Sequence, residues 1–137
     1  MNSLARKMTD NLEELARMEV EDNGKSISEA RADVAASADS FSFFGGISPT
    51  IQGQHIPLSN GSFGLVKREP LGVVGAIGAW NYPILNCAWK AAPALACGNT
   101  LVYKPSELTP LSSLALAELG LEVGLPPGVF NIIQVPI

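Results

Sequence analysis

The strongest constraint on the fold is the alternation of short apolar runs with longer helical patterns after residue 72. Two helical patterns lie at about 83–97 and 110–123, and each separates two of the runs. In α/β proteins this order places the strands parallel in one sheet, joined by right-handed crossovers. The runs expected to form the strands are 73–77, 100–103 and 129–135.

Prolines and glycines predict where these elements begin and end. The run 73–77 has few polar breaks, as in a strand buried on both faces. Pro83 suits an early helical position, and Thr109 is the expected N-cap of the second helix. Pro93 should kink or divide the first helix, and Gly124 should stop the second. The expected fold class is α/β, with a βαβαβ core that forms part of a doubly wound, Rossmann-like parallel sheet.

Two helices are expected before this core. Apolar residues recur at helical spacing between residues 3 and 22, with charged residues among them, which predicts an amphipathic helix. Ser26 and Glu29 match a capping box, in which the two side chains cap each other's backbone N–H at the helix start. This second helix should run to about Phe44 and end at the Gly-Gly pair that follows.

A loop and one strand should connect these helices to the core. Residues 47–62 contain several prolines and glycines and are expected to be a loop, and residues 63–68 are expected to be a partly exposed strand. The chain is therefore predicted to be one partial nucleotide-binding domain, 1–137, in three parts. These are a helical lead-in (1–46), a loop with a strand (47–70) and the βαβαβ core (71–137).

Composition excludes several classes of partner. The net charge is −4, the sequence pI is about 4.9 and no stretch is rich in Lys and Arg, so a nucleic-acid partner is not expected. No apolar run approaches the roughly 20 residues that span a bilayer. Cys87 and Cys97 would lie ~15 Å apart on one helix, too far for a disulfide. A reducing, cytoplasmic location is expected, and no Cys/His cluster predicts a metal site.

Ligands of doubly wound sheets bind beyond the carboxyl ends of the strands, so the residues that follow 73–77 carry most information. Asn81 stands there, just before a helix. Its side chain could cap that helix, or it could donate an amide N–H to negative charge developing on a substrate oxygen. The spacing alone favours the cap.

A second polar group follows the strand at 100–103. Lys104 and Glu107 stand three apart on the expected turn and could hold the hydroxyls of a ribose, or they could be a solvated surface turn. The glycines at 72, 75 and 78 do not form G-x-G-x-x-G, and no phosphate-binding P-loop occurs. The usual dinucleotide fingerprint is therefore absent.

Five ordered motifs resemble the aldehyde dehydrogenase superfamily. The match covers nearly the whole chain, and its most similar branch is that of the betaine-aldehyde and 4-trimethylaminobutyraldehyde dehydrogenases. This family does not use G-x-G-x-x-G, so the missing fingerprint is consistent with it. The motifs are W-N-[FY]-P at 80–83, A-W-K at 88–90, P-A-L-A-x-G-N at 93–99, K-P-S-E-x-T-P at 104–110 and P-P-G-V-x-N at 126–131.

The resemblance implies oxidation of a small-molecule aldehyde to a carboxylic acid with NAD(P)+. Asn81 matches the amide of the family's oxyanion hole. Lys104 and Glu107, with Ser106 between them, match the residues that hold the adenosine ribose of NAD. Ile77 and Trp80 match positions that line the nicotinamide half of the cofactor cleft. Glu107 favours NAD over NADP, because a carboxylate near the ribose would repel a 2′-phosphate.

Two aromatic residues match positions of the family's substrate tunnel. Tyr82 and Trp89 stand seven apart, about two helical turns, and such a pair could attract a quaternary ammonium group through cation–π contact. The alternative is that both are core aromatics that pack the helix on the sheet. Tyr82 in place of the more common Phe points toward aminoaldehydes.

The match also lacks essential parts. The family's Cys nucleophile and Glu general base lie downstream of the matched stretch, and neither Cys87 nor Cys97 aligns with the nucleophile. We therefore expect a fragment that is inactive alone, with a homo-oligomer formed by the full-length family protein. The alternative is a non-catalytic truncated product that binds an intact subunit or has no activity. An open sheet of three strands should also be marginally stable or aggregate.

Overall fold

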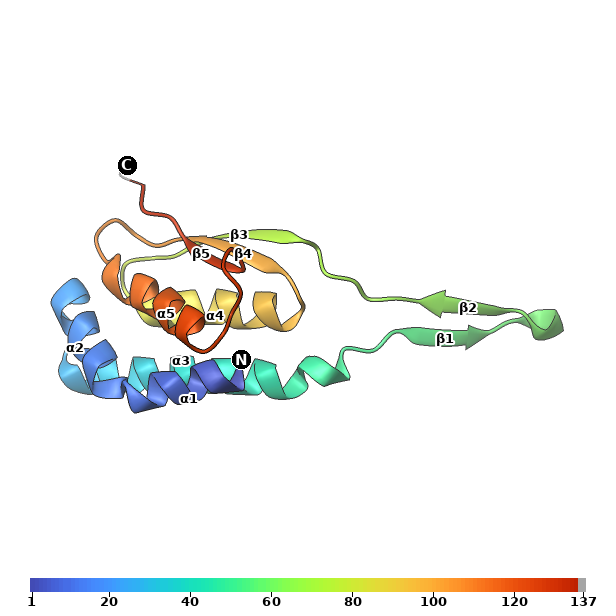
Figure 1. Ribbon diagram of the computed structural model, residues 1–137, viewed down its shortest axis with the longest axis horizontal. Helices are drawn as coiled ribbons and strands as arrows, with labels where there is room; N and C mark the ends of the chain where they lie inside the picture. Colours follow the sequence, from blue (N-terminus) through green and yellow to red (C-terminus); the bar gives the residue numbers. More distant parts are fainter. Residues whose placement is uncertain (136–137) are drawn as a thin grey trace.

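Helices cover only one face of a three-stranded sheet in this protein, and a hairpin projects away from both (Figure 1). The structure is a computed structural model that describes residues 1–135. Its elements, in chain order, are α1 (Asn2–Asp10), α2 (Leu12–Asn23), α3 (Ile27–Ile47), the 3-10 turn η1 (Ser48–Thr50), β1 (Gln54–Pro57), the 3-10 turn η2 (Ser59–Gly61), β2 (Phe63–Val66), β3 (Val73–Ile77), α4 (Pro83–Ala96), β4 (Thr100–Lys104), α5 (Leu111–Glu122) and β5 (Phe130–Ile132).

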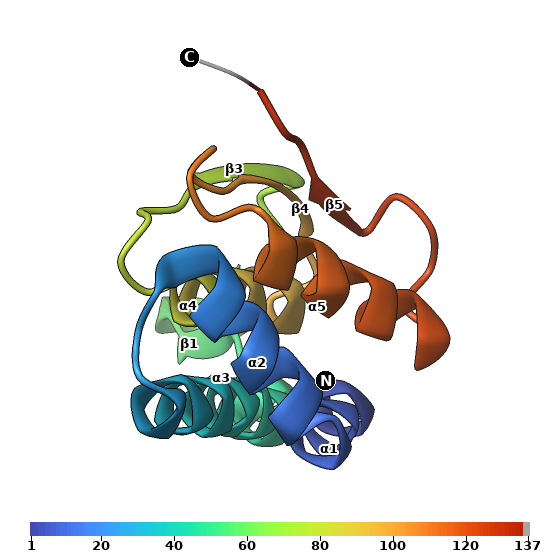
Figure 2. The ribbon, with the colours of Figure 1, turned by 90° about the vertical axis from the view of Figure 1, so that its left-hand side faces the viewer.

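The sheet confirms the predicted parallel βαβαβ arrangement. Its strand order is β3-β4-β5, and both pairs of neighbours are parallel. In the register, Val73 lies opposite Thr100 and Ile77 opposite Lys104, while Leu101 faces Phe130. α4 and α5 lie on the same side of the sheet, and α1 and α3 form a further layer beyond them (Figures 1 and 2).

The hydrophobic core fills the space between the sheet and these helices. Side chains of β4 point into it, and Leu101 and Tyr103 are fully buried. Among the largest buried core residues are Leu4, Met8, Val34, Phe41, Ile84 and Leu116. The core therefore draws on the helical lead-in as much as on the sheet.

The outer face of the sheet has no such cover. Val73 is 76% exposed and Ile77 is 73% exposed, although both lie in strand β3. The expectation that 73–77 is buried on both faces is therefore wrong. The reason is that all five α-helices of the described residues lie on one side of the sheet.

The predicted helix over residues 3–22 is divided in two at Asn11. The backbone of Asn11 has φ −105° and ψ 20°, outside the regular helical range. Its side-chain Nδ2 donates to the Lys7 carbonyl at 2.7 Å, which competes with regular helix geometry. α1 and α2 consequently run in different directions (Figure 2).

Two other helix boundaries also differ from prediction. α3 does not end near Phe44 but continues through Gly45 to Ile47. A Cβ at Gly45 would lie 2.8 Å from the Cβ of Met1, so the glycine permits α1 to approach α3 closely. α4 is not divided at Pro93, which lies in its last turn and still accepts a hydrogen bond from Cys97 N at 3.1 Å.

Residues 47–62 are not the simple loop that was predicted. They include β1, which pairs antiparallel with β2 in a hairpin. Asn60 and Gly61 have positive φ values of 61° and 77°, as a tight hairpin connection requires. β2 is shorter than the predicted strand 63–68, and both strands of the hairpin are exposed except at Gly64, which is half-buried.

The third strand of the core is also shorter than predicted. β5 covers Phe130–Ile132 rather than 129–135, and beyond it Gln134 Nε2 donates to the carbonyl of Pro110 at 3.3 Å. The end of α5 agrees with prediction, since Gly124 follows it with φ 91°. Residues 136–137 lie outside the described part of the chain.

Both cysteines are free thiols, as predicted, with Cys87 buried and Cys97 exposed. In the part of the chain that the structure describes, no helix combines the length and apolar character needed to cross a membrane. Within residues 1–135, no three His, Cys, Asp or Glu side chains gather as metal ligands would.

The one-sided sheet predicts unequal effects on stability for two Thr substitutions on neighbouring strands. Val73→Thr should reduce aggregation and leave the unfolding midpoint nearly unchanged, because Val73 already faces water. Leu101→Thr, the control on the buried face, should lower the free energy of unfolding by about 3 kcal/mol. Light scattering and urea unfolding would measure both quantities. A sharp two-state transition in a soluble wild-type monomer would contradict the expected marginal stability.

Candidate functional site

The carboxyl ends of β3 and β4 lie side by side and bring the two predicted polar segments together. Ile77 and Lys104 are partners in the register, and Gly78 N donates to the Lys104 carbonyl at 2.8 Å. The segments 78–82 and 105–109 therefore leave the sheet at the same edge. This is the edge where doubly wound sheets bind ligands.

A shallow hollow of about 650 Å³ lies on the uncovered face of the sheet next to this edge. Two of the residues predicted to bind the cofactor, Ile77 and Lys104, line it, whereas Trp80, Ser106 and Glu107 do not. The remaining lining residues are small or apolar: Gly75, Ala76, Val102 and Ile133. A flat ligand could lie against this face and reach the Lys104 ammonium.

The turn after β4 holds a charged pair at its surface. Lys104 Nζ lies 3.6 Å from Glu107 Oε2 and also donates to the Pro105 carbonyl at 3.1 Å. Ser106 Oγ accepts the backbone N–H of Leu108 at 3.3 Å. Because the Lys and Glu side chains are only partly buried, their remaining hydrogen-bonding groups can reach a ligand.

Asn81 does not cap α4, which corrects the simpler prediction for this residue. The N-cap position is Tyr82, and Asn81 is exposed. Within residues 1–135, the Asn81 side chain makes no hydrogen bond. The N–H of Ile84 in the first turn of α4 is instead accepted by Oε1 of Glu19, at 2.9 Å. The Asn81 amide is thus left free.

Glu19 belongs to a buried ionic cluster that the sequence analysis missed. Its Oε2 lies 3.2 Å from Nζ of Lys25, which also pairs with Asp33. Burial alone would lower the pKa of Lys25, but the bonds to Asp33 and Glu19 outweigh it and raise the pKa. No motif or spacing in the sequence pointed to Lys25 as a partner of Glu19.

The two aromatic residues lie at the surface, so the interpretation of both as core residues is wrong. Tyr82 is 46% exposed and Trp89 is 56% exposed. Lys25 Nζ lies 4.8 Å from the centroid of the Tyr82 ring, within cation–π range. One face of this ring is therefore already in contact with a cation of the protein itself.

A second contact from α2 holds the same loop. Asn23 Nδ2 donates to the Trp80 carbonyl at 2.7 Å. Contacts from α2 and the residues just after it thus lie on both sides of Asn81. Sequence patterns could not predict this contact, because the two residues lie 57 positions apart.

α2 also supplies the cap of α5, which corrects the prediction for Thr109. Asp22 Oδ2 accepts the N–H of Leu111 at 2.8 Å, whereas the Thr109 hydroxyl is buried without a partner within residues 1–135. Burial raises the pKa of Asp22, although its bonds to Leu111 and Ser112 act in the opposite direction. Both crossover helices therefore begin on carboxylates of α2.

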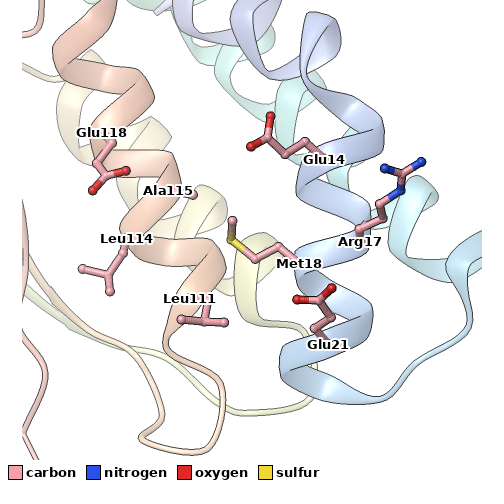
Figure 3. A pocket seen from close by; sticks show the side chains of 8 residues that line it. All are labelled: Glu14, Arg17, Met18, Glu21, Leu111, Leu114, Ala115 and Glu118. Carbon is pink, nitrogen blue, oxygen red and sulfur yellow. The ribbon is translucent and has the colours of Figure 1, made fainter.

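Beside this cap, α2 and α5 border an open cavity of about 490 Å³ (Figure 3). Met18, Leu111 and Leu114 form its apolar part, and charged side chains surround them: Glu14, Arg17, Glu21 and Glu118. None of the predicted site residues lines this cavity. It is separate from the edge of the sheet described above.

Cys87 is not poised to act as a nucleophile. The thiol is buried in α4, and burial raises its pKa to about 12. A nucleophilic cysteine needs a lowered pKa and access to substrate. The Cys87 thiol has neither property in this structure.

Comparison with known proteins places the chain among aldehyde dehydrogenases. Residues 1–136 match the aldehyde dehydrogenase family. Among curated relatives, the 4-trimethylaminobutyraldehyde dehydrogenases of Sus scrofa and Homo sapiens are 53% and 52% identical to this chain over 130 residues. Each alignment covers 95% of this chain but 26% of the relative, so the chain spans about a quarter of their length.

Solved structures show the same fold. A putative aldehyde dehydrogenase from Burkholderia cenocepacia aligns with a TM-score of 0.95 and 44% identity, over 97% of this chain and 28% of that one. A betaine aldehyde dehydrogenase point mutant from Staphylococcus aureus, solved in complex with NAD+, aligns with a TM-score of 0.93 and 41% identity. That alignment covers 97% of this chain and 27% of the other.

The two thiols should react very differently with iodoacetamide. The folded chain should be alkylated at Cys97, which is exposed, and Cys87 should react only after unfolding. The pKa of the Cys87 thiol is 9.0 in the unfolded chain, and burial raises it to about 12 in the folded chain. The free energy of unfolding should therefore fall as the pH rises from 9.0 to about 12. Mass spectrometry of alkylated peptides would measure the labelling, and rapid labelling of Cys87 at neutral pH would contradict its burial.

Gly78 is expected to tolerate no side chain. A Cβ at this position would overlap the ring and hydroxyl of Tyr103, which is fully buried. Gly78→Ala should therefore lower the free energy of unfolding by about 2 kcal/mol. Gly75→Ala is the matched control, because a Cβ there meets nothing within 4 Å. Equal stability of the two variants in urea unfolding would show that the loop is not closely packed on Tyr103.

Proposed function

Because the chain belongs to the aldehyde dehydrogenase family, we propose that it forms the part of an aldehyde-oxidising enzyme that holds NAD+ and supplies one oxyanion donor. The observation that carries this proposal is the pairing of Ile77 with Lys104 beside the hollow at the carboxyl edge of the sheet. In this reading the whole chain, 1–137, is a partial NAD(P)-binding domain. The reaction yields a carboxylic acid and NADH.

The residues at this edge fit a dinucleotide in their chemistry. Lys104 would donate to ribose hydroxyls and Glu107 would accept from them, with Ser106 on the same turn. Gly75 and Ala76 have small or no side chains, which leaves room for a flat group next to Ile77. Trp80 would border the nicotinamide half. NAD+ supplies the acceptor for the hydride, and the carboxylate of Glu107 favours it over NADP.

Asn81 would stabilise the oxyanion that forms when a nucleophile attacks the aldehyde carbonyl. Its exposed amide with no partner within residues 1–135 supports this role, since the N–H groups are not engaged elsewhere. Donors aimed at developing charge act best when they need no rearrangement. Tyr82 and Trp89 would line the approach of the substrate, and their exposure supports this.

We further propose that the 137 residues contain no catalytic nucleophile. The raised pKa of Cys87 and its burial support this, and neither cysteine aligns with the family's nucleophile. The chain would then act only as part of a longer protein. The alternative is a non-catalytic product that binds an intact subunit or has no activity of its own.

We propose an aminoaldehyde substrate, a homo-oligomer of the longer protein and a cytoplasmic location. The names of the relatives favour an aminoaldehyde, and the electron-rich face of Tyr82 suits a quaternary ammonium group. That group would have to use the part of the ring that Lys25 leaves open.

A homo-oligomer of the longer protein is supported by the projecting hairpin, where Phe63 and Leu65 are exposed. A cytoplasmic location is supported by the two free thiols.

NAD+ should bind to the 137-residue chain, and binding should depend on the turn after β4. Lys104→Ala removes a charged hydrogen-bond donor and Glu107→Gln removes the charge of an acceptor, so each should weaken binding about tenfold, as expected when a charge-assisted hydrogen bond is lost. Glu122→Gln is the control, because Glu122 at the end of α5 pairs with Lys7 of α1 and is not part of the turn after β4. Tryptophan fluorescence titration would measure the dissociation constants.

Two outcomes would contradict the proposal in different ways. Equal dissociation constants in all three variants would show that Lys104 and Glu107 do not contact the cofactor. Formation of NADH from NAD+ and an aldehyde by the chain alone would contradict the absence of a nucleophile.

A further inference from the structure

The loop that carries Asn81 begins a helix without a cap of its own. No side chain within the loop accepts an N–H of the first turn of α4. Asn is among the strongest N-cap residues, and Asn81 stands directly before the N-cap position. A side-chain amide engaged in a cap would have its oxygen fixed by the helix and its orientation set by that bond.

Glu19 supplies the missing acceptor from another helix. Its Oε1 accepts the N–H of Ile84 at 2.9 Å, although the two residues lie 65 positions apart. Glu19 is fully buried, and Lys25 and Asp33 accompany it in the ionic cluster. A buried carboxylate is costly unless it is paired and hydrogen-bonded, so this arrangement needs three side chains to do what one local Asn could do.

We infer that Glu19 is a positioning residue for the proposed oxyanion donor. By accepting the Ile84 N–H, it takes the capping role that Asn81 would otherwise fill and keeps the Asn81 amide free for substrate. The bond from Asn23 Nδ2 to the Trp80 carbonyl fixes the loop on the other side of Asn81. This inference rests on the proposed function.

A double-mutant cycle in the full 137-residue chain tests the inference. In the wild type, Asn81→Ala should change the equilibrium constant of unfolding by less than about twofold, because Asn81 caps nothing. In a Glu19→Met background, where the acceptor is lost, Asn81 should turn to cap α4. Asn81→Ala should then shift the constant by about fivefold, the typical effect of losing an N-cap.

Two further variants separate capping from a general loss of structure. Glu19→Gln keeps an oxygen that can accept the Ile84 N–H, so Asn81→Ala should remain neutral in that background. Asp22→Ala removes the cap of α5 instead, and its effect should add to that of Asn81→Ala without coupling. If Glu19→Met does not fold, Glu19→Asp replaces it, since it keeps the charge but withdraws the carboxylate by about 1.5 Å.

The side-chain amide of Asn81 gives a readout that a purely structural role of Glu19 would not move. In ¹⁵N-edited NMR spectra its NH₂ protons should exchange rapidly with water in the wild type, and the amide resonances should shift in the Glu19→Met chain. Slow exchange in the wild type would overturn the inference. So would the absence of coupling between Asn81→Ala and Glu19→Met, or between Asn81→Ala and Glu19→Asp where the Met variant does not fold. If neither Glu19→Met nor Glu19→Asp folds, the exchange rate of the Asn81 NH₂ protons in the wild type is the test of the inference.

These results are independent of cofactor binding. Loss of NAD+ binding with an intact coupling between Glu19 and Asn81 would reject the proposed function and retain the capping relationship. Normal NAD+ binding without coupling would reject the inference and leave the proposed function in place.

Discussion

The two crossover helices of this fold begin on carboxylates that come from a single earlier helix. Glu19 accepts the first-turn N–H of α4, and Asp22, three residues later, accepts that of α5. Unpaired N–H groups at a helix start are costly when buried, so each carboxylate satisfies a need that the local sequence leaves open. The βαβαβ core therefore depends on α2 for its helix starts as well as for part of its hydrophobic contacts. The helical lead-in is an integral part of the fold.

The features that the sequence predicted well are those set by local patterns. Apolar runs and helical periodicity identified β3, β4, α4 and α5, and the strand–helix order was enough to predict a parallel sheet. The break at Asn11 depends on one side-chain bond that competes with the helix, and periodicity does not register it. β1 depends on its partner strand and has no buried face, so no apolar alternation reveals it. The open face of the sheet reflects where the helices pack, which strand composition alone cannot specify.

The candidate site was predictable in position but not in its supporting contacts. The rule that ligands bind at the carboxyl ends of parallel strands pointed to the two segments that carry Asn81 and Lys104, and these lie at one edge. The capping role expected for Asn81 failed because Glu19 accepts the N–H of Ile84, a residue 65 positions away from it in the chain. Lys25 was missed for the same reason, since its contacts with Glu19 and Tyr82 exist only in three dimensions. Assignments that rest on a family motif identify residues, whereas the groups that orient them have to be found in the structure.

The uncovered face of the sheet ties the stability of the chain to whatever lies against it. Ile77 and Val102 line the hollow on that face. Because the Ile77 side chain is exposed to water, it adds little hydrophobic stabilisation to the folded state. A molecule that binds this face in the folded state alone stabilises that state by RT ln(1 + [L]/Kd), through mass action. Occupancy of the hollow and survival of the fold are thus thermodynamically linked. In a cell, the lifetime of the chain against proteolysis would follow the concentration of its ligand.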